Sequence, residues 1–374
     1  MNKIPHLFLV AILVLIFEVE AFAAPSISSV SGQIVHGQSI TISGSAFGTK
    51  PVPGPLVWDN FESGSLGTRI GGNAPTVRNI STSWVWSDGS SNGVVYPVYS
   101  NAVVRGVSTK SSLHDFSTIT GCALTIPTAQ TTYYFTWWYH TVRTGANWPR
   151  QTKPFILEGS TGDQMPAAYI GWGQVYPPPD ESLRTALIDN STTLEPTIWF
   201  DPSFSAIQGE WIRFEVLLIQ SSSNVHNGTF KVWVHTTATP SIAQPVNIGG
   251  NALTRVTNNY WNALNIGDYY SHGDATDGGK VYIDDFYLDN AQARVEIGNA
   301  STWSSCTRRE IQIPSAWSDT SVTITVNQGL FKQGTSAYLY VVDSNGSVNP
   351  MGYPISIGVD PRAPAPPSGL KIIN

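Results

Sequence analysis

Almost no part of this chain has the 3.6-residue period of an amphipathic helix. Instead, alternating apolar and polar residues run between clusters of Gly, Asn, Asp, Ser and Pro. Such alternation puts successive side chains on opposite faces of a half-buried strand. The clearest runs are Thr132–Val142, Trp211–Ile219, Thr229–Val234, Val281–Asp289, Ala293–Ile297, Ser321–Val326 and Ala337–Val342. The pattern predicts an all-β protein of sandwich or barrel type.

The first residues have the features of a secretory signal peptide. Lys3 precedes the apolar run Leu7–Phe17, and Ala21–Ala23 has the small residues of a cleavage site. The apolar run is shorter than the roughly 20 residues that a membrane span needs, and no second run of that length follows. We therefore predict a secreted protein, extracellular, periplasmic or held at the cell surface, with no membrane span.

Composition limits the classes of partner. Charged residues make up 12% of the chain, aromatic residues 11%, and the net charge is −6. A protein that binds nucleic acid needs a basic surface, so this balance argues against such a partner. Cys122 and Cys306 are the two cysteines. A bridge between them and two separate buried thiols both remain open in an oxidising compartment.

Two distant segments resemble parts of one small domain. Ile40–Thr49 is similar to the opening hairpin of an immunoglobulin-like module of the IPT/TIG family, and Trp317–Val326 is similar to its later strands. The stretch between them is far too long for a loop. This resemblance implies that a second domain is inserted into an Ig-like sandwich.

The inserted region resembles the concanavalin A-like jelly rolls of lectins, glucanases and polysaccharide lyases. Gly209–Val216 and Asn227–Val234 are similar to a hairpin of secreted lyase-like jelly rolls, although His235 departs from its usual ending. Tyr282–Leu288 and Trp58–Glu62 are similar to the closing and opening strands. The fold expected is thus a concanavalin A-like jelly roll inserted in an IPT/TIG-like sandwich.

The domain boundaries follow from these resemblances. We predict a signal peptide at 1–23, an IPT/TIG-like domain in two parts at 24–54 and 292–358, a jelly roll at 55–291, and a Pro-rich tail at 359–374.

Aromatic and polar residues within the jelly roll suggest polysaccharide recognition. On the strand around Trp138 and His140, flat rings alternate with hydrogen-bonding groups, a mixture that suits sugars. Core packing on both faces of that strand is the alternative. The leading hypothesis is that the concave face of the jelly roll binds a polysaccharide or cell-surface glycan. Its candidate binding residues are Trp138, Arg143, Trp148, Lys153 and Trp172.

Two other functions remain open. A polysaccharide lyase that cleaves a uronate-containing glycan by β-elimination needs a cation to neutralise the carboxylate, a base and an acid. Candidates for these roles are His140, Tyr139, Arg150, His272 and Tyr270. A glycoside hydrolase is a weaker hypothesis, because no two acids of the mature chain stand at positions i and i+2 of one strand. The third alternative is a structural or adhesive surface protein without a glycan site.

A structural calcium ion is the one cofactor that the sequence suggests. Jelly rolls of this class often bind Ca²⁺ where their first and last strands meet, through carboxylates and backbone carbonyls. Glu62, Asp284 and Asp285 are the candidate ligands. No organic cofactor is expected.

Overall fold

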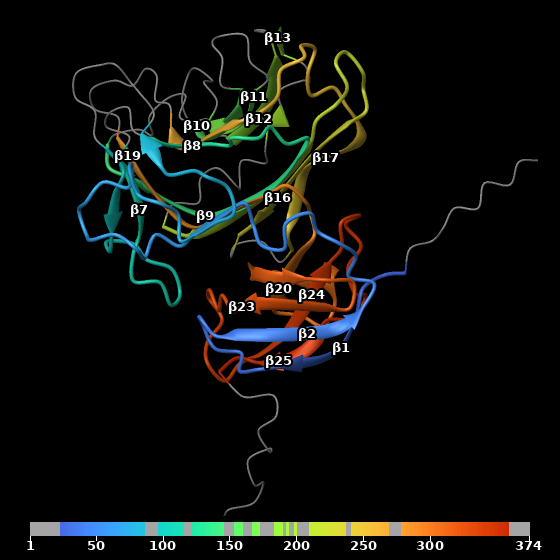
Figure 1. Ribbon diagram of the computed structural model, residues 1–374. Coiled ribbons are helices and arrows are strands. Elements are labelled where there is room, and N and C mark those ends of the chain that lie inside the picture. Colours follow the sequence, from blue (N-terminus) through green and yellow to red (C-terminus); the bar gives the residue numbers. More distant parts are fainter. Residues whose placement is uncertain are drawn as a thin grey trace, which may run out of the picture.

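The computed structural model describes residues 23–86, 96–115, 121–145, 153–159, 167–172, 183–189, 192–193, 198–199, 209–236, 241–268 and 278–358. These residues form two stacked β-sandwiches, a large one above and a small one below in Figure 1. The only helical element among them is a 3₁₀ turn at Trp303–Ser305. The all-β prediction is confirmed. The predicted signal peptide up to residue 22 and the Pro-rich tail from residue 359 lie outside the described residues.

The small sandwich combines segments from both ends of the described chain. Strand β2 (Ser39–Ser45) pairs with β23 (Ser321–Thr325), and β1 (Ser26–Ser31) and β22 (Ile313–Trp317) lie at the edges of that sheet. The second sheet has the order β21 (Arg309–Ile311), β20 (Arg294–Gly298), β24 (Ser336–Val342), β25 (Tyr353–Ser356). Its own core includes Ile42, Ile297, Ile324 and Leu339. Membership of the IPT/TIG family stays a prediction.

The large sandwich is a jelly-roll type of fold with two antiparallel sheets. In the described chain, the sheet nearer the small sandwich has nine strands: β17 (Ala243–Ala252), β16 (Gly228–His235), β15 (Trp211–Ile219), β9 (Thr132–Arg143), β19 (Gly279–Asp289), β3 (Val57–Asp59), β4 (Val77–Arg78), β6 (Val98–Ser100) and β7 (Ser111–Asp115). The other sheet, as far as described, has eight: β13 (Thr192–Thr193), β12 (Leu183–Asp189), β11 (Ala167–Trp172), β10 (Lys153–Glu158), β18 (Ala263–Asp268), β8 (Cys122–Thr125), β5 (Val85–Trp86) and β14 (Ile198–Trp199).

Strand alternation explains what lies between the two sheets. Phe135 and Trp137 of β9 point inward together with Phe214 of β15 and Val232 of β16. The rings of Phe135 and Trp137 stack on Phe155 of β10, with centroids 4.2 and 5.0 Å from its ring centroid. Both faces of the β15–β16 hairpin therefore carry the residues that the period of two predicts. Cys122 lies in this core, and Cys306 is a separate buried thiol in the small sandwich.

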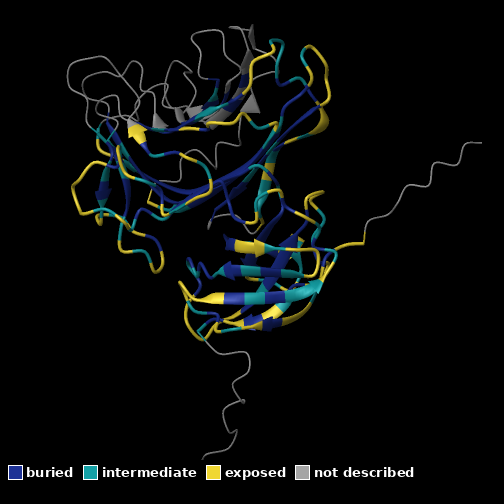
Figure 2. Ribbon diagram, in the orientation of Figure 1, coloured by how far each residue is buried: buried dark blue, intermediate teal, exposed yellow. Residues whose placement is uncertain are grey.

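The outer face of the nine-stranded sheet is not a solvated surface. Its convex side lies against the small sandwich in Figure 1, and Figure 2 shows the strands at this junction as mostly buried. Arg213 and Glu215, which a half-exposed strand would present to water, have no exposed area. Strand alternation alone would predict an open polar face here, but the small sandwich, which is built from distant segments of the chain, covers it.

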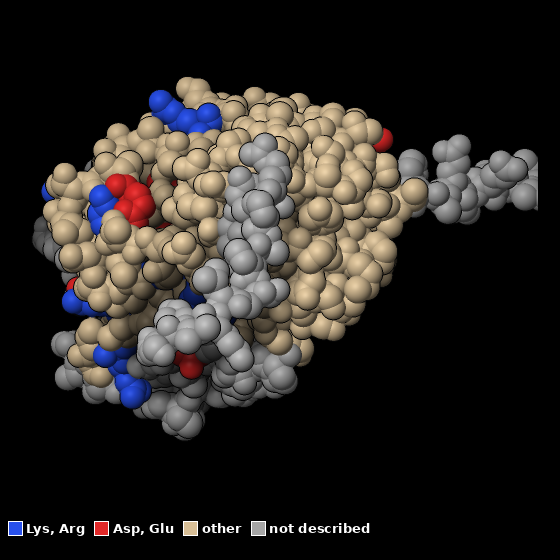
Figure 3. Space-filling view, turned by 90° about the horizontal axis from the view of Figure 1, so that it is seen from below, with Lys and Arg blue, Asp and Glu red and all other residues tan. Residues whose placement is uncertain are grey.

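The surface that Figure 3 shows from below is largely uncharged. This fits a chain in which only 12% of residues are charged. Several of those charges are instead buried at the junction of the two sandwiches, including Arg105, Arg213, Glu215, Glu296 and Glu310. Such residues are almost never fully buried unless they are paired. The junction is therefore the part of the fold where polar chemistry is concentrated.

Candidate functional site: a pocket between the two sandwiches

An apolar cluster joins the two sandwiches. Trp58, Tyr134 and Tyr287 from the outer face of the nine-stranded sheet pack with Ile311 and Ile313 of the small sandwich. Tyr134 and Tyr287 meet edge to face, with ring centroids 6.2 Å apart. The cluster fixes how the two sandwiches lie relative to one another.

A buried ionic network crosses the same junction in both directions. Arg213 of the large sandwich donates to Glu296 of the small one at 2.8 Å and to the Arg309 carbonyl at 2.7 Å. In return, Arg309 donates to Glu215 of the large sandwich at 2.8 Å. Arg294 lies 2.6 Å from Glu296 and 3.4 Å from Glu215. The free-energy cost of taking these charges out of water is offset by ion pairs that run in both directions across the junction.

Protonation in this network follows from burial and neighbouring charge. Burial alone would raise the pKa of Glu215, but Arg213 and Arg309 outweigh it and hold that pKa well below its usual value. Burial lowers the pKa of His235 to about 4, although the adjacent Glu215 acts in the opposite direction. His235 is therefore neutral at pH 7 and contacts the Glu215 carboxylate as a hydrogen-bonding partner.

The network carries an excess of positive charge at neutral pH. Three guanidinium groups, those of Arg213, Arg294 and Arg309, face the two carboxylates of Glu215 and Glu296. Since His235 is neutral, it adds no further charge. The network thus holds one cation more than it holds anions.

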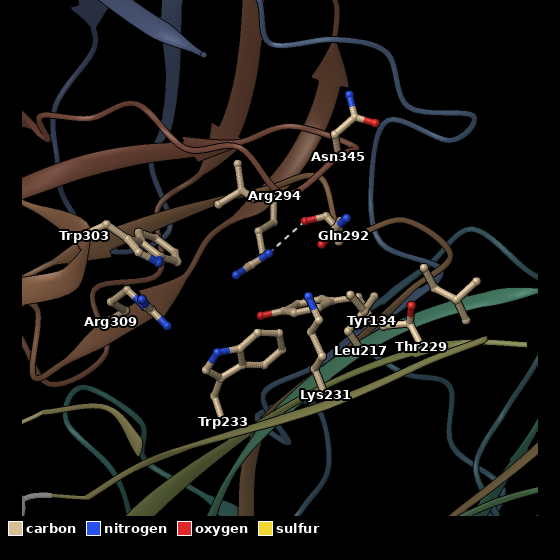
Figure 4. Close-up of a pocket in the computed structure, with 13 residues that line it drawn as sticks. Tyr134, Leu217, Thr229, Lys231, Trp233, Gln292, Arg294, Trp303, Arg309 and Asn345 are labelled. Carbon is tan, nitrogen blue, oxygen red and sulfur yellow. Dashed lines mark hydrogen bonds between the residues drawn. The ribbon is translucent and has the colours of Figure 1, made fainter. Parts of the chain in front are cut away.

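A pocket opens beside this network, between the two sandwiches (Figure 4). Its volume is about 240 Å³. Lys231 and Trp233 extend into it from β16, and Arg294, Arg309 and Trp303 reach it from the small sandwich. The full lining comprises Tyr134, Leu217, Ile219, Thr229, Lys231, Trp233, Gln292, Arg294, Trp303, Arg309, Val342, Asn345 and Gly346.

The lining combines flat rings with hydrogen-bond donors. Trp233 and Trp303 line the pocket, and both residues are half-buried. Arg309 stacks on Trp303, with its guanidinium carbon 3.6 Å from the ring centroid, which holds that indole in place. Lys231, Gln292 and Asn345 bring ammonium and amide groups. The pocket is more polar than the mostly apolar hollow that usually holds a small ligand.

Trp138, a predicted groove residue, lies at the junction instead of in an open groove. Its indole nitrogen donates to Glu310 of the small sandwich at 3.1 Å. The Arg105 guanidinium covers its ring at 4.4 Å from the centroid. Only 3% of the residue is exposed. In this arrangement Trp138 connects the two sandwiches and is not accessible to a polymer.

The two described catalytic candidates point to opposite faces of β9. Tyr139 lies inside the core between the sheets, and burial raises its pKa well above the usual value. His140 faces outward against Trp211 and Tyr282, with ring centroids 5.3 and 6.0 Å away. Burial lowers the pKa of His140, so its ring is neutral. The structure does not bring these two side chains together.

The structure describes only some of the remaining predicted binding and catalytic residues. Arg143 is exposed at the end of β9. Lys153 and Trp172 belong to β10 and β11, but their side chains lie outside the described part. Trp148, Arg150, Tyr270 and His272 lie outside the described residues altogether.

The three predicted calcium ligands do not form a ligand set in the structure. Asp285 is ion-paired with Arg105, and Glu62 accepts backbone hydrogen bonds from Thr109 and Lys110. Burial raises the pKa of Asp284 to about 8, so this acid is mostly protonated at pH 7. Among the described residues, no group of three or more His, Cys, Asp and Glu could hold a metal. Calcium binding stays a prediction.

Sequence reasoning did not single out most of the pocket residues. Strand alternation predicts that Lys231 and Trp233 share the face opposite Val232 and Val234, and the structure confirms this. Trp303, Arg294 and Arg309 belong to the small sandwich, in which the sequence suggested no candidate residues. The signal that could have found them is the run Arg308-Arg309 close to Trp303 in a charge-poor chain.

Comparisons with known proteins give structural likeness only. No protein-family model and no curated protein matches this chain. The PL-14 alginate lyase of Aplysia kurodai is similar over 51% of this chain and 86% of its own, at 10% identity and a TM-score of 0.39. An endo-β-1,4-glucuronan lyase of the fungus Trichoderma reesei is similar over 63% and 95%, at 10% identity and a TM-score of 0.40.

A third likeness is to the binding domain of botulinum neurotoxin serotype D/C, over 78% of this chain and 72% of that one, at 8% identity and a TM-score of 0.40. Likenesses of this degree carry no argument about function. None of the residues that the structure describes form a helix long and apolar enough to cross a membrane.

Proposed function

We propose that this is a secreted polysaccharide-recognising protein that binds glycan in the pocket between its two sandwiches. The observation that supports this is the convergence of two half-buried tryptophans, Trp233 and Trp303, with ammonium and amide donors in one hollow. Sugar rings present C–H faces that stack on aromatic rings and hydroxyl groups that need polar partners. The lining supplies both.

The proposed site differs from the one that the sequence suggested. The sequence hypothesis placed the glycan on the concave face of the jelly roll, around Trp138. In the structure Trp138 is buried under Arg105, whereas Trp233 on the same outer sheet face is half-exposed. The proposed site therefore lies on the convex outer face of the nine-stranded sheet, on β16 and not β9, and it includes residues of the small sandwich; the sequence hypothesis had named the concave face.

The test is retention of the purified mature protein on a panel of immobilised neutral and acidic polysaccharides. We expect Trp233→Ala to weaken retention about tenfold, because loss of one stacking ring removes on the order of 1.4 kcal/mol. Tyr260→Ala is the matched control, since Tyr260 is 43% exposed and does not line the pocket. Circular dichroism and thermal melting check that each variant is folded.

Two results would contradict the proposal. Unchanged retention of Trp233→Ala on every glycan would place recognition elsewhere. Steadily rising ultraviolet absorbance when the protein is mixed with a uronate polymer would indicate unsaturated products. That outcome would favour the lyase alternative over a protein that only binds.

A further inference from the structure

Lys231 is the least satisfied charge of the pocket. It projects from the middle of β16 and is half-buried. Among the described residues no carboxylate forms an ion pair with it, and no acceptor bonds its ammonium group. Arg294 and Arg309, by contrast, are each paired with Glu215 and Glu296. Lys231 is therefore available to a ligand.

The charges lining the pocket all have one sign. Lys231, Arg294 and Arg309 line it, and no Asp or Glu is among its lining residues. The two carboxylates behind the arginines neutralise only part of their charge and that of Arg213. In a chain with a net charge of −6, this is a locally cationic hollow. Low-dielectric walls strengthen the field inside such a hollow.

We propose that the pocket takes an anionic sugar unit, one that bears a carboxylate or a sulfate group, and that Lys231 is its ion-pairing residue. This inference rests on the proposed function, because it concerns the same pocket. Trp233 stands two residues from Lys231 on the same strand face, so an indole and an ammonium group approach the ligand from one side. The stacking ring then holds the sugar while the ammonium selects for its charge.

The experiment compares polymers that differ in charge but not in backbone. Polygalacturonate is paired with its methyl ester, and dextran sulfate with dextran, which separates a carboxylate from a sulfate preference. We expect the charged member of at least one pair to bind more tightly, and rising salt to weaken that binding. Lys231→Gln should lower affinity for the charged polymer about tenfold and leave affinity for the neutral one unchanged.

Lys332→Gln is the control, since it removes the same charge from an exposed position that does not line the pocket. An equal loss in this variant would show a general charge effect and overturn the inference. So would a charge preference that survives Lys231→Gln, or no retention of either charged polymer at low salt.

The two proposals can fail separately. If charged and neutral polymers bind equally and Trp233→Ala abolishes both, the proposed function stands and the charge preference is wrong. If Trp233→Ala binds every polymer as the unaltered protein does, the pocket is not the glycan site.

Discussion

At the scale of single residues, His235 shows how burial and charge determine one group's protonation. It lies against Glu215 and is 2% exposed. Burial holds its folded-state pKa at about 4, below the ordinary value of 6.5. Between these two pH values the unfolded chain binds a proton that the folded chain does not bind. The contribution of His235 to the free energy of unfolding is therefore present above pH 6.5 and lost as pH falls toward 4.

This predicts a measurable difference for His235→Gln, whose amide can still donate to Glu215 but does not titrate. Between pH 7 and pH 4.5 the unaltered protein should lose about 2–3 kcal/mol more unfolding free energy than the variant, at 1.36 kcal/mol per unit of pKa shift. Urea unfolding at both pH values measures this. Equal losses in the two proteins would show that His235 is not buried as a neutral group.

At the scale of elements, the connection between β6 and β7 holds the two sandwiches together. From it Arg105 donates to both carboxylate oxygens of Glu310, at 2.9 and 3.0 Å, and also contacts Asp285. The next residue, Gly106, has φ +56°, and a Cβ there would lie 2.0 Å from the carbonyl oxygen of Gly329 in the small sandwich. Only glycine permits this approach.

Arg105→Met should therefore lower the free energy of unfolding by about 3–5 kcal/mol, because it leaves Glu310 and Asp285 buried without a counter-charge. Arg69→Met is a fair comparison, since Arg69 also lies over a ring, that of Tyr96, but is exposed. It should cost less than about 1 kcal/mol. Denaturant unfolding of both variants measures these changes. Similar losses of unfolding free energy in the two variants would show that the Arg105 ion pairs do not stabilise the junction.

The elements also show how far sequence could predict this protein. Alternation correctly assigned Phe214 and Val232 to the core, because strand parity is a local property. Alternation also places Arg213 and Trp138 on the outer face of the nine-stranded sheet, but it contains no information on what covers that face. Their partners Glu296 and Glu310 stand 83 and 172 residues further along the chain. A bulge between Asp284 and Tyr287 also interrupts the alternation within β19, and the sequence pattern does not reveal it.

At the scale of the whole molecule, the two sandwiches share too much buried structure to be independent. Separating them would expose the cluster of Trp58, Tyr287 and Ile311, and it would leave Glu215 and Glu296 without part of their cationic partners. Each loss costs several kcal/mol, of the order of a whole domain's stability. Neither sandwich should therefore unfold while the other stays native.

We accordingly expect one calorimetric transition, with equal van't Hoff and calorimetric enthalpies. Glu296→Gln, a change confined to the small sandwich, should speed hydrogen exchange of slow amides in β15 of the large sandwich as much as in β24 of its own. The reason is that Glu296 neutralises Arg213 across the junction, at 2.8 Å. Lys332→Gln, exposed on the same sandwich, should change neither strand. Faster exchange confined to β24, or two separate calorimetric transitions, would mean that the junction does not couple the two sandwiches. A pocket between them would then lack the rigid frame that a stacked sugar requires.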